Sequence, residues 1–123
     1  MDNGIMFTRT HEWVRRVDGD TVLTGLSAHA VTEMGDLVFI NLPEVGAEVK
    51  AGETMADVES VKAVSDVFSP VDGVVAEVNE ELTDAPEKIN EAPYEAWIAR
   101  INGVKSIEGL MTEDEYLDHI KNS

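Results

Sequence analysis

The sequence predicts a small, mainly β domain, a sandwich or a barrel, with one short helix after its first hairpin and another at its C-terminal end. Turn-forming residues recur at short intervals, and the segments between them are short and rich in valine. A chain of 123 residues, 43% hydrophobic and 28% charged, has the size and composition of one folded domain. We expect that domain to span residues 1–123, with its core at about 6–104 and the C-terminal helix at about 112–121.

The chain begins with a predicted hairpin and a predicted helix. Asp18-Gly19 is a typical tight-turn pair, and it separates two short apolar segments. A helix is expected over 28–34, because Ser27 can cap its beginning and Gly35 can end it.

Short strands then follow one another. The run 37–42 is apolar on both faces, which is typical of a strand covered on both sides. Residues 80–93 are polar and contain two prolines, so we expect a long ordered loop or a single helical turn there. Turns rich in glycine and proline separate the remaining strands, which we place at 54–61, 64–68, 74–78 and 96–101.

The end of the chain predicts a helix. Thr112 and Glu115 have the spacing of a capping box, in which each side chain satisfies the other's backbone amide. Tyr116, Leu117 and Ile120 then form one apolar stripe that should dock on the sheet.

The charge balance excludes several partners. The net charge is −16, which would repel nucleic acids and anionic membranes. The chain has no cysteine, so disulfides and thiolate chemistry are excluded. No apolar run approaches the ~20 residues of a membrane span, and the first residues lack the pattern of a signal peptide. We therefore expect a cytoplasmic protein with no nucleic-acid or membrane partner.

The segment 58–67 is the most informative part of the sequence. It predicts one strand out and one strand back, because an unbroken strand here would exceed the usual limit of ~10 residues. Its centre, Val61-Lys62-Ala63, lacks the glycine, asparagine, aspartate or proline that hairpin tips normally use. A lysine at this apex offers its amine to another protein. The alternative is one long strand with a solvated lysine.

Several further segments form an ordered pattern with this hairpin. They are 11–14 (HEWV), 35–46 (GDLVFINLPEVG), 59–63 (ESVKA, followed by Ser65-Asp66 and Ser69-Pro70), 73–79 (GVVAEVN) and 90–94 (NEAPY). In order and spacing they resemble the glycine cleavage system H protein family, over most of the chain. The segment around Lys62 is similar to the family's lipoylation site.

This resemblance implies a lipoyl-domain-like barrel-sandwich hybrid that acts as a carrier and not as an enzyme. It implies lipoate in amide linkage on Lys62, attached by a lipoate ligase or a lipoyl/octanoyltransferase. An enzyme is needed because an amine with a reference pKa near ~10.4 is almost wholly protonated at pH 7. The arm would shuttle an aminomethyl group and reducing equivalents between glycine decarboxylase (P protein), aminomethyltransferase (T protein) and dihydrolipoamide dehydrogenase (L protein). We expect a monomer in a bacterial cytoplasm.

The resemblance also implies roles for four other residues. Glu12 and Asp66 match family positions that contact the loaded arm, so we expect them to bind its cationic amine. A charge pair at 4 Å contributes ~1 kcal/mol in water and ~4 kcal/mol at an intermediate dielectric, which suits a reversible hold. Glu59 and Gly73 match positions associated with recognition by the attaching enzymes. A surface acid at Asp66, a cross-strand polar pair at Glu59 and turn geometry at Gly73 are the competing explanations.

The histidines and two departures from the family pattern complete the analysis. His11, His29 and His119 are far apart in the sequence and form no i, i+4 pair, so we predict no metal site and place His29 on a helix surface. Glu33 stands where many family members have a histidine lining the cleft. The segment 93–97 is one residue shorter than the family pattern and lacks its glycines. We therefore expect the cleft and this loop to differ.

Other functions remain open at this point. An H-like protein that relays or stores lipoyl groups for other 2-oxoacid dehydrogenase complexes would use the same Lys62. A biotin carrier is disfavoured, because that family flanks its lysine with methionines and here Val61 and Ala63 flank it. An unmodified acidic β module that only binds a partner is a third alternative. A hydrolase or transferase is disfavoured, because the chain lacks a Gly-x-Ser-x-Gly elbow, a phosphate-binding glycine loop and cysteine.

Overall fold

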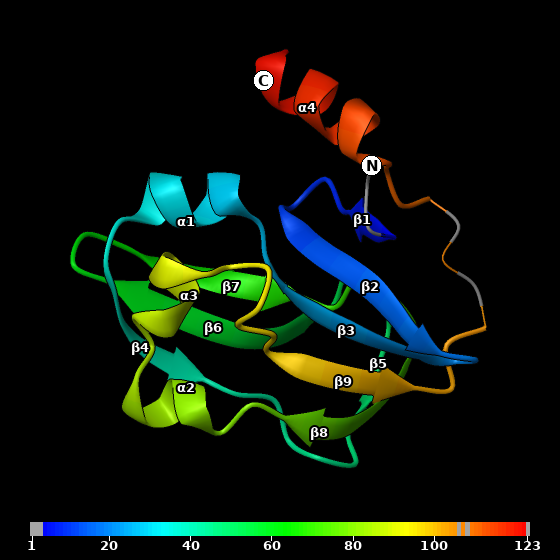
Figure 1. The fold of residues 1–123 in the computed structure, drawn as a ribbon. Helices are drawn as coiled ribbons and strands as arrows, with labels where there is room; N and C mark the ends of the chain where they lie inside the picture. The colour runs from blue at the N-terminus through cyan, green and yellow to red at the C-terminus, as the bar shows by residue number, and fades with distance from the viewer. Residues whose placement is uncertain (1–3, 106, 108, 123) are drawn as a thin grey trace.

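Two antiparallel sheets pack against each other in the computed structural model, which describes residues 4–105, 107 and 109–122 (Figure 1). The larger sheet has the strand order β1-β2-β3-β9-β8-β5, and the smaller has the order β4-β6-β7. The strands are β1 (Ile5–Phe7), β2 (Glu12–Asp18), β3 (Thr21–Leu26), β4 (Leu37–Asn41), β5 (Glu48–Val49), β6 (Thr54–Ser60), β7 (Val64–Phe68), β8 (Gly73–Val78) and β9 (Ala99–Asn102). The expected mainly β sandwich is confirmed.

One core lies between the two sheets. Val22, Val75 and Ile101 from the larger sheet are fully buried, as are Val58 and Val67 from the smaller one, and all five belong to a single apolar cluster. Burial of each such side chain contributes ~1.5–3 kcal/mol. This shared core therefore holds the smaller sheet, with its β6–β7 hairpin, against the larger one.

The first hairpin and helix α1 (Ala28–Met34) form as predicted. Strands β2 and β3 pair as far as Asp18 and Thr21, which enclose the turn. The Ser27 hydroxyl caps α1 by accepting a hydrogen bond from the Ala30 amide at 3.2 Å. Gly35 ends the helix with a φ of 82°, a conformation that favours glycine.

The prediction that the run 37–42 is covered on both sides is wrong. Leu37 and Ile40 of β4 face the core, but Val38 and Phe39 are exposed, with 54% and 45% of their surface accessible. β4 is an edge strand, and a bulge between Leu37 and Phe39 displaces Val38 from the pairing. An apolar run by itself does not say how many of its faces are covered.

The polar segment 80–93 contains two short helices instead of the expected loop or single turn. They are α2 (Glu81–Asp84) and α3 (Lys88–Glu91), with Pro86 between them. Each helix is anchored by one fully buried side chain, Leu82 in α2 and Ile89 in α3. Because the segment is polar overall, the sequence analysis did not identify these two buried side chains as anchors.

Helix α4 (Glu113–Lys121) begins at the predicted capping box. The buried ring of Tyr116 stacks on Phe7 of β1, with the ring centroids 4.3 Å apart. Ile120 packs in the same cluster, but Leu117 is exposed, so the apolar stripe is narrower than predicted. The helix consequently docks on the β1 edge of the larger sheet (Figure 1).

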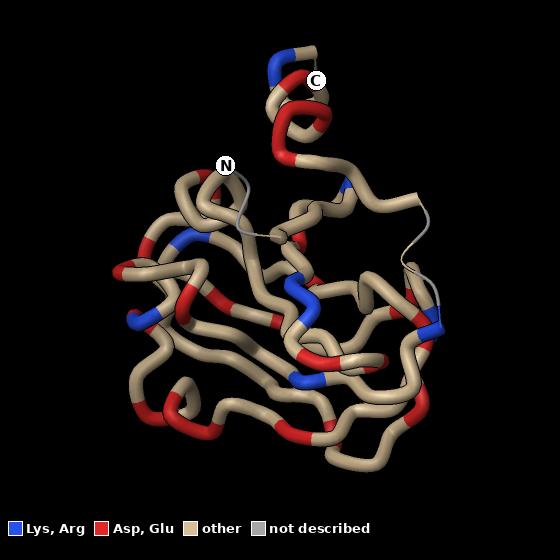
Figure 2. The backbone as a smooth tube through the Cα atoms, turned by 45° about the vertical axis from the view of Figure 1, so that its right-hand side comes forward, with Lys and Arg blue, Asp and Glu red and all other residues tan. Residues whose placement is uncertain are grey.

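Acidic residues are spread over nearly all elements, and basic residues are few (Figure 2). In the described part of the chain the ion pairs are Lys88–Glu81 at 3.5 Å and Arg100–Glu77 at 3.6 Å. Exposed pairs of this kind contribute at most ~1 kcal/mol. No helix among these residues has the length and hydropathy needed to cross a bilayer.

Candidate functional site

The predicted hairpin is present, and its tip is residues 61–63, all exposed to solvent (Figure 1). Ser60 explains how the chain turns without a conventional turn residue. Its backbone amide donates to the Ala63 carbonyl at 2.8 Å, and its buried hydroxyl accepts from the amides of Lys62 at 3.3 Å and Ala63 at 3.1 Å. A serine side chain thus supplies the local backbone contacts that stabilise the turn.

The corner between α1 and β4 supports this tip. The Val61 amide donates to the Asp36 carbonyl at 3.0 Å. The Cε of Lys62 lies 3.5 Å from the point where a Cβ on Gly35 would stand. The lysine therefore leaves the tip alongside the end of α1, with its side chain exposed.

Asn90 of α3 holds the same corner from the other side. Its Nδ2 donates to the Gly35 carbonyl at 2.9 Å, and its Oδ1 accepts from the Leu37 amide at 2.9 Å. One amide side chain thereby fixes the backbone on both sides of Asp36, whose carbonyl contacts the hairpin tip. The sequence motif around Asn90 gave no sign of this contact.

A cleft of about 250 Å³ lies between α1, β7 and the loop before β2. This volume is below the ~300–1,000 Å³ of most small-molecule sites, so the cleft suits the end of a chain more than a whole ligand. Asp66, which is exposed, is one of its lining residues. The lining is mixed polar and apolar, and consists of Thr10, His11, Leu26, His29, Ala30, Glu33, Met34, Ser65 and Asp66.

Glu12 is not among the described residues that line this cleft. Its side chain is only 1% exposed, and its carboxylate accepts hydrogen bonds from the hydroxyls of Thr8, at 2.6 Å, and Thr10. It also accepts from the Phe68 amide at 3.2 Å, which ties the end of β7 to the loop before β2. Burial raises the pKa of Glu12 above its ordinary value, and these hydrogen bonds oppose the shift. Glu12 does not enter the cleft, but it accepts a hydrogen bond from Thr10, which lines the cleft.

His11 lines the cleft and has an unusual backbone conformation. Its φ of 75° is rare for a residue other than glycine. Its Nδ1 lies 2.7 Å from the hydroxyl oxygen of Tyr116, so α4 is joined to the cleft wall. Burial and the nearby rings of His29 and His119 lower the pKa of His11, and Glu33 opposes this effect. An imidazole with a lowered pKa is uncharged near neutral pH.

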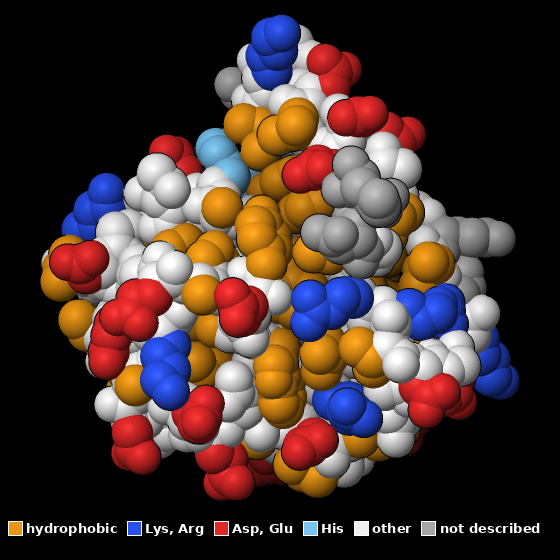
Figure 3. All heavy atoms as spheres, viewed as in Figure 1, with side chains coloured by type: hydrophobic (Ala, Val, Ile, Leu, Met, Phe, Trp, Pro, Cys, Tyr) orange, Lys and Arg blue, Asp and Glu red, His pale blue; other side chains and the backbone are white. Residues whose placement is uncertain are grey.

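The fold brings together three histidines that are distant in the sequence. The centroid of the His11 ring is 4.9 Å from that of His29 and 6.0 Å from that of His119. Figure 3 shows histidine atoms at the surface between α1 and α4. His29 is half-buried in the cleft wall and does not lie free on the helix surface. Within the described residues, no group of three or more side chains could hold a metal ion.

Gly73 lies in the larger sheet at the beginning of β8, directly after the bend at 70–72, and its φ is not positive. A Cβ at this position would be 2.5 Å from the Asn102 carbonyl oxygen and 2.5 Å from Cγ2 of Ile101. Close approach of β9 therefore explains this glycine, and the turn geometry that the sequence analysis favoured does not.

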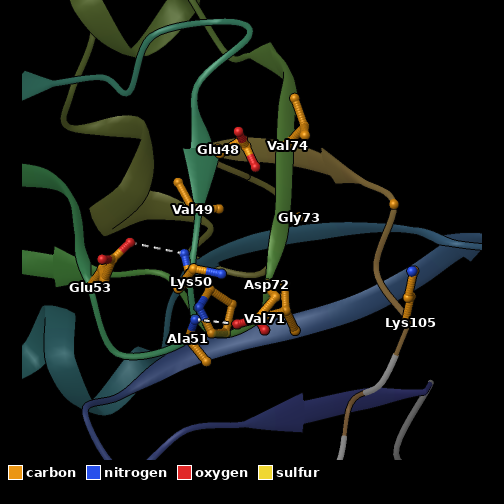
Figure 4. A pocket seen from close by; sticks show the side chains of 12 residues that line it. Glu48, Val49, Lys50, Ala51, Glu53, Val71, Asp72, Gly73, Val74 and Lys105 are labelled. Carbon is orange, nitrogen blue, oxygen red and sulfur yellow. Dashed lines mark hydrogen bonds between the residues drawn. The ribbon is translucent and has the colours of Figure 1, made fainter.

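Gly73 also lines a larger hollow of about 540 Å³, formed by β5, β8 and the turn before β6 (Figure 4). Two of its three acids are engaged in local structure: Glu53 accepts from the Lys50 amide at 3.1 Å, and Asp72 accepts from the Ala51 amide at 2.8 Å. The hollow contains neither the hairpin tip nor the cleft residues. The tip with its cleft is therefore the candidate site, despite the smaller volume.

The two departures from the family pattern have defined places. Glu33 lies in the cleft wall. The loop 93–97 is tied down at two points, because the indole of Trp13 donates to the Pro93 carbonyl at 2.9 Å and the Ala28 amide donates to the Tyr94 hydroxyl at 3.1 Å.

Known proteins resemble this chain over nearly its whole length. Residues 5–123 match the family model described as "Glycine cleavage H-protein". The chain is 55% identical to a glycine cleavage system H protein of Lachnoclostridium phytofermentans, covering 95% of this chain and 92% of the relative. It is 50% identical to a probable glycine cleavage system H protein of Pyrococcus abyssi, covering 96% and 90%. A crystal structure of a glycine cleavage system H protein from Mycobacterium marinum superimposes with a TM-score of 0.89 at 36% identity, covering 98% of this chain and 99% of that one.

Proposed function

This chain belongs to the glycine cleavage H-protein family, and from that premise we propose that Lys62 carries a lipoyl group in amide linkage. The family membership makes the chain a carrier subunit of the glycine cleavage system and not a catalyst. Its fold is accordingly the lipoyl-domain-like barrel-sandwich of its structural relative.

The hairpin tip is the observation that carries this proposal. Lys62 is exposed at the apex, and no hydrogen bond or ion pair engages its Nζ within the described residues. The backbone on each side is fixed by Ser60 and Asp36. The amine is thus accessible on a defined support, which fits an acceptor for an acyl group.

The cleft is a suitable resting place for the end of the lipoyl arm. When bound, the lipoyl group supplies a dithiolane that accepts an aminomethyl group and reducing equivalents. Asp66 presents a carboxylate for a cationic amine, and Leu26 and Met34 contribute apolar surface to the lining, which disfavours water beside the arm. A strand rises ~3.3 Å per residue, so Asp66 lies on the order of 10 Å from the tip, within reach of an extended lysine arm.

Two neighbours keep this cleft suitable for a cation. The lowered pKa of His11 leaves its ring uncharged near neutral pH, so the ring does not repel an amine. Glu12 joins β7 to Thr10 and so positions the rim that carries Asp66. We assign direct contact to Asp66, and to Glu12 a role that acts through Thr10.

The proposal extends to the partners. The arm shuttles the aminomethyl group and reducing equivalents between the glycine decarboxylase, the aminomethyltransferase and the dihydrolipoamide dehydrogenase. A lipoate ligase or a lipoyl/octanoyltransferase attaches the group, and Glu59 contributes to recognition. Glu59 is exposed beside the tip, which supports that role. The position of Gly73 in the other sheet gives it a packing role.

Mass spectrometry tests the attachment. The chain is incubated with a lipoate ligase, lipoate and ATP, and its peptides are mapped. We expect one lipoyl adduct, on Lys62, which Lys62→Arg loses and the control Lys50→Arg keeps. Absence of an adduct on the wild-type chain, or an adduct elsewhere, would overturn the proposal. Glycine decarboxylation with a cognate decarboxylase then separates this carrier role from a lipoyl relay.

A further inference from the structure

The outward face of the smaller sheet carries a mixed apolar and acidic surface next to Lys62. Residues paired across antiparallel strands share one face. Phe39, Glu59 and Val64 form the first row across β4, β6 and β7, and Asn41, Asp57 and Asp66 form a second row on the same face. We call these six residues the hairpin face.

Exposed apolar side chains are concentrated here. Of the eight large hydrophobic residues exposed among those described, four lie on the hairpin face or directly beside it: Val38, Phe39, Val61 and Val64. Phe39 and Val64, the latter 69% exposed, flank Glu59 on neighbouring strands. At the left edge of Figure 3, over the end of this hairpin, hydrophobic and charged side chains lie side by side. Grouped exposed apolar side chains of this kind mark interaction surfaces.

The acids on this face lack a positively charged partner among the described residues, although the Asn41 side-chain amide donates to the Asp57 carboxylate at 3.2 Å. Asp57 stands directly opposite Asp66, and like charges in that position are destabilising. Neither of them, nor Glu59, takes part in an ion pair within the described residues. Arginine or lysine side chains of a partner would relieve this repulsion while its apolar groups cover Phe39 and Val64.

The position of the hairpin face next to Lys62 indicates which enzyme binds to it. Acylation of Nζ removes one proton from the amine, forms the amide C–N bond at the carbonyl carbon of an activated lipoyl donor and breaks the bond to that donor's leaving group. The active site that performs this step must reach a bare lysine, so its surface must lie against the neighbours of the tip. Enzymes that act on a finished arm need to contact only its far end, which can move away from the tip and from Asp66.

We propose that the hairpin face is the docking surface for the enzyme that acylates Lys62, through an apolar patch flanked by basic side chains on that enzyme. This inference rests on the proposed lipoylation of Lys62. It adds Phe39, Asp57 and Val64 to the single recognition residue, Glu59, that the family pattern indicates on this face.

Two matched pairs of variants test the proposal. Val64→Thr keeps the side-chain shape and removes apolar surface, and its control is Val45→Thr, a valine 62% exposed in a distant loop. Glu59→Gln is compared with Glu48→Gln, which makes the same charge change in the larger sheet. Acylation by a purified lipoate ligase with lipoate and ATP is followed by intact mass. We expect Val64→Thr and Glu59→Gln each to lower kcat/KM about tenfold through KM, as removal of a buried interface contact does. The controls should stay within about twofold.

The possible results are distinct. If the wild-type chain is acylated at Lys62 and both hairpin-face variants match it, the docking proposal is overturned while the proposed function stands. If the wild-type chain is not acylated, the proposed function itself fails. Fully lipoylated variants are then assayed with the glycine decarboxylase, where we expect wild-type rates. A loss confined to that assay would assign the face to the decarboxylase and overturn the proposal. Because Val64 and Glu59 are exposed, neither change threatens folding, which thermal unfolding checks.

Discussion

Lys62 lies directly beside Gly35, because the terminal methylene of the lysine is 3.5 Å from where a Cβ on Gly35 would stand. Gly35 has a φ of 82° and a ψ of −159°, a combination almost confined to glycine. The residue that ends α1 therefore also lies beside the stem of the lysine, at an ordinary van der Waals distance. Gly35 therefore both ends α1 and lies beside the attachment lysine.

Gly35→Ala should separate these two roles. We expect it to lower the free energy of unfolding by ~1–3 kcal/mol through backbone strain, and to slow acylation of Lys62 by displacing the adjoining Asp36 carbonyl, which holds the hairpin tip. Gly46→Ala is the matched control, because Gly46 has a φ of 94° and no atom within 4 Å of an added Cβ. Urea unfolding and the ligase assay measure both effects. Equal acylation rates for the two variants would show that Gly35 does not support Lys62.

Asn90→Asp should loosen the hairpin tip from a distance. The change replaces the amide that donates to the Gly35 carbonyl by an acceptor, which costs ~1–3 kcal/mol. We expect faster hydrogen exchange at the Val61 amide, which bonds to the adjoining Asp36, and a lower kcat for acylation with little change in KM. Asn122→Asp is the control, because Asn122 also donates its amide to a backbone carbonyl, that of Asp118, at the end of α4. Exchange at Val61 equal to that of the wild type would contradict this prediction.

Glu12→Gln should change how stability depends on pH. Burial, the largest cause, raises the folded-state pKa of Glu12 above 4.5, so the folded chain keeps this proton to a higher pH than the unfolded chain. The contribution of Glu12 is therefore fully present below the unfolded pKa and is lost as pH rises through the folded pKa. Glutamine does not titrate. We expect the stability of Glu12→Gln relative to the wild type to increase from pH 4.5 to 7 in urea unfolding, with exposed Glu48→Gln unchanged. A decrease over that interval would show that the pKa is not raised.

Glu12→Gln should also affect the loaded arm. The amide cannot accept from Phe68 and from both hydroxyls as a carboxylate does, so the rim that carries Asp66 should be less ordered. We expect normal lipoylation of Lys62 and a shorter lifetime of the loaded state, measured as release of ammonia from the loaded carrier. An unchanged lifetime would remove Glu12 from the support of the cleft.

Gly73→Ala should act on stability alone. An added Cβ would meet the Asn102 carbonyl at 2.5 Å, and backbone cannot rotate away as a side chain can. We expect a loss of ~1–3 kcal/mol or more from overpacking, whereas Gly19→Ala, with open space around its Cβ, should have little effect. Once folded, both variants should be acylated at the wild-type rate. Slower acylation without loss of stability would restore a recognition role for Gly73.

The sequence predicted the hairpin tip well because its signal is local. Strand-forming residues on both sides of Val61-Lys62-Ala63 left few other conformations for that segment. The role of Ser60 was missed, because a hydroxyl that accepts two amides of the next residues looks like any other serine in a strand. The role of Asn90 was missed because its partners, Gly35 and Leu37, are distant along the chain.

The cleft shows a second limit of prediction from sequence. Asp66 was placed through the family pattern, and the structure puts it at the cleft rim. Glu12 was expected beside it, but a carboxylate one residue after a positive-φ histidine turns inward. No local pattern signals that conformation at His11. The exposure of Phe39 was missed for a related reason, because apolar character predicts burial only when another element is available to cover it.

The fixed backbone of the tip sets how a tethered group explores the cleft. A group attached to Nζ moves only by rotation about side-chain bonds, so its free end samples a small volume around one stationary point. Short flexible tethers give local concentrations of the order of millimolar. An intrinsic dissociation constant of ~1 mM, equivalent to about −4.1 kcal/mol, therefore half-fills the cleft. So weak an attraction releases its occupant readily to any enzyme that binds it more tightly.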